Sequence, residues 1–279
     1  MHFLPGFMTI LSLSVIIHAN PTRSGSPKLS LMKRFHPKIT NCHDEEHVRK
    51  SLDQVSGLAV GAYGVLANGD GWKSNKGYTH YFKESDYEQV KKAYELLMGI
   101  GDSIPFEIRC APQEECVAGD FAYADSTPES FEGHGLTKGV RTITLCPPFF
   151  TDSRTTGNLP PADDQEGLKA YCKFKESKKV MDFEVGGHTL LHEITHLDAF
   201  GVAAGYPEVA YTPKRAGDFA YQYHGTIDWK DKSTAGNARN LKTSKVKNKP
   251  ETWQNAESLA AAATEIGAMW RCDLKDIPY

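Results

Sequence analysis

The feature that most constrains the fold of this chain is the five-residue pattern HExxH, which begins at His192 and ends at His196. In a helix the two imidazoles lie one turn apart on the same face and can bind one zinc ion. Glu193 would then stand beside the metal and could act as general base on the attacking water. The apolar periodicity around the pattern predicts a helix from Met181 to Phe200, closed by Gly201.

Two residues near the pattern are interpreted as lying outside the zinc coordination. His188 lies one turn before His192 and could orient ligands or bind metal weakly. If His188 and His192 were the catalytic pair, the general base would have to stand at position 189, which is Thr189. We therefore interpret His188 as structural. Asp198 is only two residues past His196 and is expected to point away from the metal face.

A catalytic zinc ion needs a third protein ligand and an open position. Two downstream carboxylates are candidates. Asp228 closes the segment His-Gly-Thr-Ile-Asp, and Glu257 lies in Asn-Ala-Glu-Ser near the start of the predicted final helix. The residues alone leave both candidates open.

The order of these motifs resembles the aspzincin metallopeptidases, the family that includes deuterolysin and the fungal lysine-specific metalloendopeptidases. The likeness covers about residues 140–272. It implies a zincin-like fold in which Asp228 is the third zinc ligand and Glu257 orients a histidine ligand. The sequences Gly-His-Thr-Leu-Leu-His-Glu and Asn-Ala-Glu-Ser-Leu-Ala-Ala-Ala-Ala-Thr-Glu are also similar to a group of secreted fungal proteins with a related peptidase-like domain.

The chain departs from the family pattern in three ways. The spacing between the second histidine and the aspartate is longer than in deuterolysin-like enzymes. The family tyrosine that helps to stabilise the oxyanion is Asp231 here, and Tyr221 or Tyr223 could substitute for it. Glu257 stands where the family usually has aspartate, which keeps it open as an alternative third ligand.

The N-terminal residues predict secretion. Residues 1–19 contain an apolar stretch too short to span a membrane and end in Ala19, as a cleaved signal peptide does. Residues 20–37 are rich in Pro, Ser and Lys and are predicted to be a linker or a short pro-segment. The dibasic pair Lys33-Arg34 is equally compatible with a proteolytic processing site that releases a pro-segment and with a solvated linker.

The cysteines agree with an oxidising compartment. Six follow the predicted signal, an even number that allows up to three disulfides, but six cysteines permit about 15 pairings and the sequence does not choose among them. They are Cys42, Cys110, Cys116, Cys146, Cys172 and Cys272.

We predict one α+β domain at residues 38–279, zincin-like and mostly helical, with a small sheet and an active-site helix that carries HExxH. Loops are expected at 67–80 and 150–165, and an irregular region at 201–251. Helices are predicted at 43–66, 85–98, 181–200 and 251–270, and strands at 105–110, 117–123 and 140–146.

The predicted function is a secreted, monomeric zinc endopeptidase that binds one Zn²⁺ per chain and cleaves protein or peptide substrates. The alternative is a non-catalytic zinc-binding protein on the same fold, an antigen or a zinc scavenger. The presence of Glu193 favours hydrolysis, because a protein that only binds zinc does not need a general base at this position. A net charge of −3 argues against nucleic acid as a partner, and we expect no membrane association after signal removal.

Overall fold

The computed structural model describes residues 36–99, 104–125, 141–161, 163–173, 178–211, 221–230 and 233–278. The chain divides into two units, Met1–Leu31 and Met32–Tyr279, and all described residues belong to the second. The predicted signal peptide, nearly all of the predicted linker and the dibasic pair therefore lie outside the described residues. Within the described ranges, no helix is both long and apolar enough to cross a membrane.

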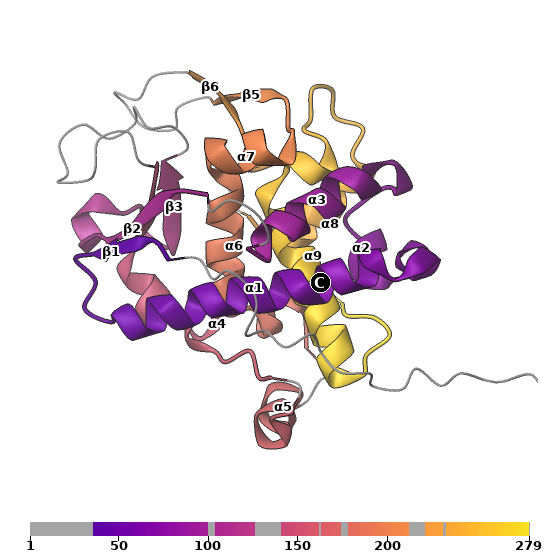
Figure 1. Ribbon diagram of the computed structural model, residues 1–279, viewed down its shortest axis with the longest axis horizontal. Coiled ribbons are helices and arrows are strands. Elements are labelled where there is room, and N and C mark those ends of the chain that lie inside the picture. The colour runs from indigo at the N-terminus through magenta and orange to yellow at the C-terminus, as the bar shows by residue number, and fades with distance from the viewer. Residues whose placement is uncertain are drawn as a thin grey trace, which may run out of the picture. The chain divides into compact units, whose positions relative to one another are not determined.

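Helix α6 (Gly186–His196), which carries HExxH, is buried along its whole length. It packs against α1 (Glu45–Ala67), α9 (Ala256–Cys272) and strand β3 (Ala122–Asp125), as Figure 1 shows. The HExxH residues are therefore helical, as predicted. Because every face of α6 has a neighbour, its polar side chains must find partners inside the protein.

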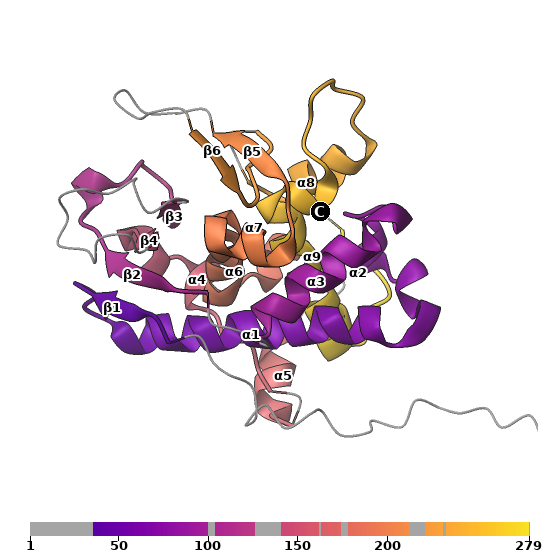
Figure 2. The same cartoon turned by 45° about the horizontal axis from the view of Figure 1, so that its top comes forward.

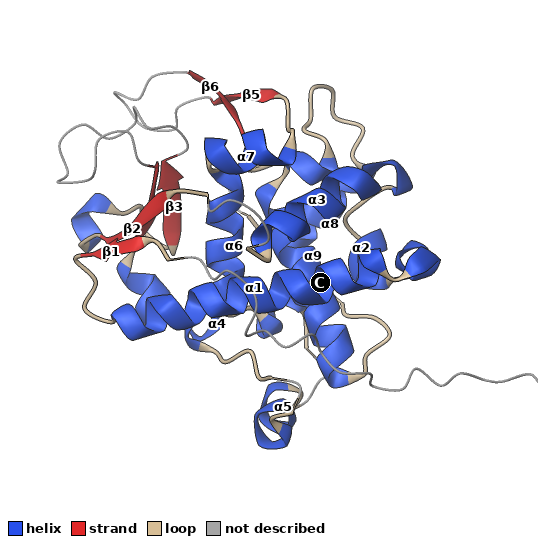
Figure 3. Cartoon of the chain, viewed as in Figure 1, coloured by secondary structure: helices blue, strands red, loops and turns tan. Residues whose placement is uncertain are grey.

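The sheet is small and mixed, and lies at one end of α1 (Figure 3). Its strand order is β1-β2-β4-β3, with β1 (Lys38–Thr40), β2 (Phe106–Cys110) and β4 (Arg141–Leu145) parallel and β3 antiparallel to β4. An α+β architecture with mostly helices and a small sheet is thus confirmed. Strand β3 begins later than the predicted 117–123, because a turn at 118–119, with Gly119 at φ +90°, comes first.

Three disulfides join segments that are distant in sequence, and their presence confirms the predicted number. They are Cys42–Cys110, Cys116–Cys146 and Cys172–Cys272, which separate their partners by 68, 30 and 100 residues. The first joins the end of β1 to β2, and the last joins the segment after α5 (Gln165–Tyr171) to the end of α9.

The predicted single helix at 181–200 is wrong in detail. A 3₁₀ turn at Val180–Phe183 precedes α6, and the helix stops at His196 because Leu197 is extended, with ψ 130°. A separate helix, α7 (Asp198–Ala204), follows and ends at Gly205, whose φ is +73°.

The regions predicted as loops contain further short elements. The region expected to be irregular holds a hairpin of β5 (Glu208–Tyr211) and β6 (Tyr221–His224) beside α7 (Figure 2) and helix α8 (Ala235–Thr243). Helix α3 (Tyr87–Leu97) is the helix predicted at 85–98. The remaining helices are α2 (Lys76–Thr79) and α4 (Ser153–Thr156), with 3₁₀ turns at Gly69–Lys73, Glu84–Asp86, Gln113–Glu115, Pro147–Phe150 and Thr252–Gln254.

Candidate metal centre

The segment that carries Asp228 passes very close to the end of the HExxH helix. A Cβ atom on Gly201 would lie 2.2 Å from the backbone nitrogen of Gly225, and one on Gly225 would lie 2.8 Å from the carbonyl oxygen of His196. Gly225 also has φ +152°, which favours glycine. The backbone N–H of Thr226 then donates to the Thr195 carbonyl at 3.0 Å. Gly225 therefore permits the close backbone contact.

The other side of this segment contacts the start of α9. Ile227 forms a parallel bridge with Asn255, and its N–H donates to the Gln254 carbonyl at 2.8 Å. The Trp229 N–H donates to Asn255 Oδ1 at 3.0 Å. Asp228 therefore sits between two fixed neighbours, and the Asn-Ala-Glu-Ser motif positions it through Asn255.

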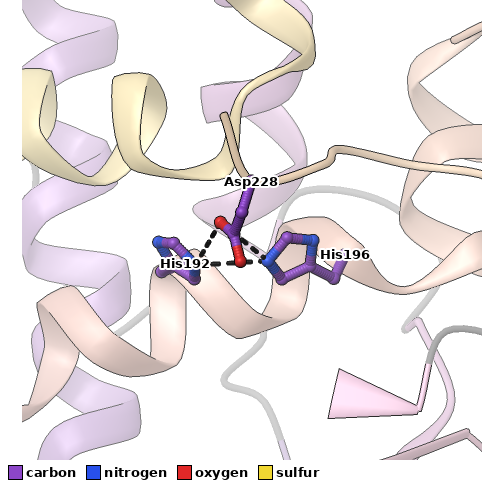
Figure 4. Close-up of side chains that lie close together, drawn as sticks. All are labelled: His192, His196 and Asp228. Carbon is purple, nitrogen blue, oxygen red and sulfur yellow. Dashed lines mark hydrogen bonds and ion pairs between the residues drawn. The ribbon is translucent and has the colours of Figure 1, made fainter. Parts of the chain in front are cut away.

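These contacts bring His192, His196 and Asp228 together, as Figure 4 shows. The Nε2 atoms of the two histidines lie 3.2 Å apart. Asp228 Oδ1 lies 3.1 Å from His192 Nε2 and 3.5 Å from His196 Nε2. Zinc–ligand bonds of about 2.0–2.1 Å in a tetrahedral site place neighbouring ligand atoms about 3.3 Å apart. The three atoms therefore have the spacing of one face of a zinc tetrahedron.

The other ring nitrogen of each histidine has an acceptor of its own. His192 Nδ1 lies 3.2 Å from Glu257 Oε2, and His196 Nδ1 lies 2.8 Å from the Thr226 carbonyl oxygen. A proton on each Nδ1 leaves the Nε2 lone pairs directed at the site of the three donors, the usual arrangement of metal-binding histidines. The geometry places Glu257 behind His192 and Asp228 in front of it, which favours Asp228 over Glu257 as the third ligand.

The electrostatics of the three groups favour a positive charge between them. Burial lowers the pKa of His192, but the Asp228 carboxylate outweighs it and the pKa is raised well above its ordinary value. Burial likewise opposes ionisation of Asp228, yet His196 and His192 hold the pKa of its carboxyl well below the usual range. The side chain of Asp228 keeps 30% of its surface exposed, so the site opens to solvent on this side.

Glu193 is buried beside the two histidines, with 7% of its surface exposed. Burial raises the pKa of its carboxyl, and the neighbouring His192 and His196 partly oppose that shift. A carboxyl whose pKa is shifted towards neutrality is suited to take up and release a proton.

The remaining predicted residues have other positions. Asp198 accepts from the His224 N–H at 3.0 Å and pairs with Arg141 at 2.9 Å, in agreement with its exclusion as a ligand. The Tyr223 hydroxyl donates to the Thr226 carbonyl at 2.6 Å, so it supports the backbone behind His196. Asp231 and the side chain of Tyr221 lie outside the described residues.

Sequence reasoning did not anticipate the Thr226 carbonyl or the role of Asn255. No local sequence pattern indicates that a backbone carbonyl will accept a hydrogen bond from a histidine. Asn255 was noted only as part of the Asn-Ala-acidic-Ser match, and no role was predicted for it. No family model matches the chain, and no curated protein shows a significant match.

Proposed function

We propose that this chain is an extracellular zinc-dependent endopeptidase of the aspzincin type, with His192, His196 and Asp228 as ligands. The observation that carries the proposal is the spacing of 3.1–3.5 Å among the three donor atoms, with Glu193 buried beside them. Three disulfides support an oxidising, extracellular location.

The chain's own residues supply orientation and proton transfer. Zinc, when bound, supplies a Lewis acid and makes a nucleophile available at neutral pH. Glu193 takes the proton from the attacking water and delivers it to the leaving amine. Glu257 and the Thr226 carbonyl hold the two imidazoles in the tautomer that leaves Nε2 free. The exposed side of Asp228 is the side from which a peptide can approach.

One observation favours the second candidate function, a non-catalytic zinc-binding protein. The Tyr223 hydroxyl is engaged with the Thr226 carbonyl rather than turned towards the substrate side, and the residue at the position of the family tyrosine is Asp231. An enzyme of this kind loses rate without a donor for the developing oxyanion, whereas a zinc binder does not need one.

Glu193→Gln separates the two functions. The substitution keeps the side-chain shape and leaves all three proposed ligands intact, so we expect zinc content equal to that of the parent protein. Hydrolysis of a broad peptide library, assayed with and without a zinc chelator, should fall at least about 10²-fold with loss of the general base. Glu251→Gln, on an exposed side chain paired with Lys83, is the matched control and should behave as the parent.

Chelator-sensitive cleavage that is absent from Glu193→Gln would support the peptidase. A parent protein that holds zinc and cleaves no peptide would support the zinc-binding function. Equal rates in parent and Glu193→Gln would contradict the proposed role of this residue.

A further inference from the structure

A second group of possible ligands lies one helical turn before the candidate centre. It consists of Glu184, His188 and Glu257, and one donor atom of each lies within 4.8 Å of the others. Glu184 precedes α6, His188 lies in its first turn, and Glu257 lies in the first turn of α9. This cluster shares no residue with the three donors of the candidate centre.

His188 is oriented in the way that metal-binding histidines are. Its Nδ1 lies 2.9 Å from Thr264 Oγ1, which leaves Nε2 on the side of the carboxylates. The distance from Nε2 to Glu257 Oε2 is 3.4 Å. Two ligand atoms bound to one zinc ion are separated by about 3.3 Å, so this pair already has the separation that a shared cation requires.

The carboxylate of Glu257 has one oxygen that the described residues leave without a hydrogen-bond partner. Oε2 faces both His188 and His192, whereas Oε1 is buried and unpaired within the described part of the chain. Glu257 is only 4% exposed. Buried polar atoms normally have a partner, and an exception calls for a bound water or ion. The unpaired oxygen belongs to the same carboxylate whose Oε2 contacts His188.

The charges of the cluster are compatible with a bound cation. Two carboxylates, the partly buried Glu184 and the buried Glu257, meet around a single buried imidazole, and like charges at such a site repel unless a positive charge lies between them. One imidazole with two carboxylates is a donor set that suits a divalent ion such as zinc or manganese.

We propose that Glu184, His188 and Glu257 form a second divalent-cation site, so that the chain holds two ions instead of the single zinc expected from its sequence. Glu257 contacts both His188 and His192. An ion at the second site draws negative charge away from His192, and each ion therefore weakens the binding of the other. The second site does not depend on peptide hydrolysis.

Zinc titration of the purified full chain tests the proposal. After removal of metals with a chelator, Zn²⁺ alone is titrated calorimetrically, and bound zinc is counted by elemental analysis. We expect two zinc ions per parent chain. Glu184→Gln and His188→Gln should each bind one, with the affinity of the remaining ion increased. Asp228→Asn should lose the ion of the candidate centre and keep the second.

His80→Gln is the matched control, because His80, Glu265 and Asp276 form another cluster with donor atoms within 4.8 Å. This variant should still bind two ions. Circular dichroism checks that each variant is folded, and Glu184→Gln remains informative if His188→Gln does not fold.

One zinc ion in the parent chain would overturn the proposal, as would two ions that persist in both Glu184→Gln and His188→Gln. If His80→Gln were the one variant to lose the second ion, that ion would be bound by His80, Glu265 and Asp276, and the proposal would also be overturned. Absence of peptide hydrolysis would leave these counts unchanged, so failure of the proposed enzyme and failure of the second site are distinguishable.

Discussion

At the scale of single residues, the carbonyl oxygen of Thr226 accepts two hydrogen bonds from side chains of the candidate centre and its surroundings. It accepts from His196 Nδ1 at 2.8 Å and from the Tyr223 hydroxyl at 2.6 Å. A carbonyl with two donors is fixed in direction, and it fixes the imidazole in turn. Tyr223 therefore acts on His196 through the backbone, and its hydroxyl is not free to bind a developing oxyanion.

Tyr223→Phe tests this role. The variant loses one donor to a carbonyl that keeps its bond from His196, so we expect kcat/KM of any peptidase activity to fall less than about tenfold. Removal of an oxyanion donor costs about 10²–10³ in rate. The matched control is Tyr206→Phe, which removes a buried hydroxyl that has no hydrogen-bond partner among the described residues. A fall in kcat/KM of about 10²-fold or more in Tyr223→Phe, but not in Tyr206→Phe, would indicate that Tyr223 stabilises the oxyanion.

At the scale of elements, the sequence predicts the parts of the site that are local. The spacing of His192 and His196 is enough to place both imidazoles on one helical face. The break at Leu197 has no local signal, since neither Gly nor Pro stands there. The contacts that accompany it are tertiary, because Asp198, at the start of α7, binds Arg141 and the His224 backbone.

The approach of Asp228 is equally non-local. It depends on β6 passing over α7 and on the bridge from Ile227 to Asn255. Hydrophobic periodicity carries no information on such contacts. The residues alone left Asp228 and Glu257 as candidates, and only the match of Gly-Thr-x-Asp to a known family favoured Asp228. The hairpin was missed because its strands have only four residues each, EVAY and YQYH, which is too short for a clear alternation. Helix α8 was missed because Leu241 is its one large apolar residue.

Gly201→Ala tests the close contact between α7 and the Asp228 segment. The added methyl would lie 2.2 Å from the Gly225 nitrogen and 2.4 Å from the His224 carbonyl carbon, both backbone atoms, so the segment must move. We expect a loss of about 1–3 kcal/mol of unfolding free energy in urea and zinc affinity weaker by at least about tenfold, the scale of effect seen when the supports of metal ligands are disturbed.

The control for this variant is Gly61→Ala in α1, where the new methyl meets nothing within 4 Å. This change should stabilise the protein by about 0.5–1 kcal/mol through helix propensity and leave zinc affinity unchanged. Parent-like zinc binding and stability in Gly201→Ala would show that the segment is not held by this contact.

At the scale of the whole molecule, the candidate centre joins parts of the chain that are far apart in sequence. Two of the proposed ligands come from α6 and one from the segment after β6, and Glu257 from α9 contacts His192. The disulfides join other segments, the sheet and the end of α9. A zinc ion bound at the centre would add a cross-link where no disulfide exists, and an ion that binds only the folded state stabilises that state.

Chelation should therefore lower the melting temperature while the disulfides stay intact. With free zinc about a thousandfold above its Kd, binding contributes about 4 kcal/mol. A domain of this size shifts by about 2–4 °C per kcal/mol, so scanning calorimetry of the parent protein should show a fall of about 8–16 °C after zinc removal. Asp228→Asn lacks the ion of the candidate centre, so its melting temperature should fall less on chelation than that of the parent. An ion bound by the three donors in the folded state must add its binding free energy to the free energy of unfolding. A parent melting temperature that chelator does not change would therefore show that these donors bind no ion.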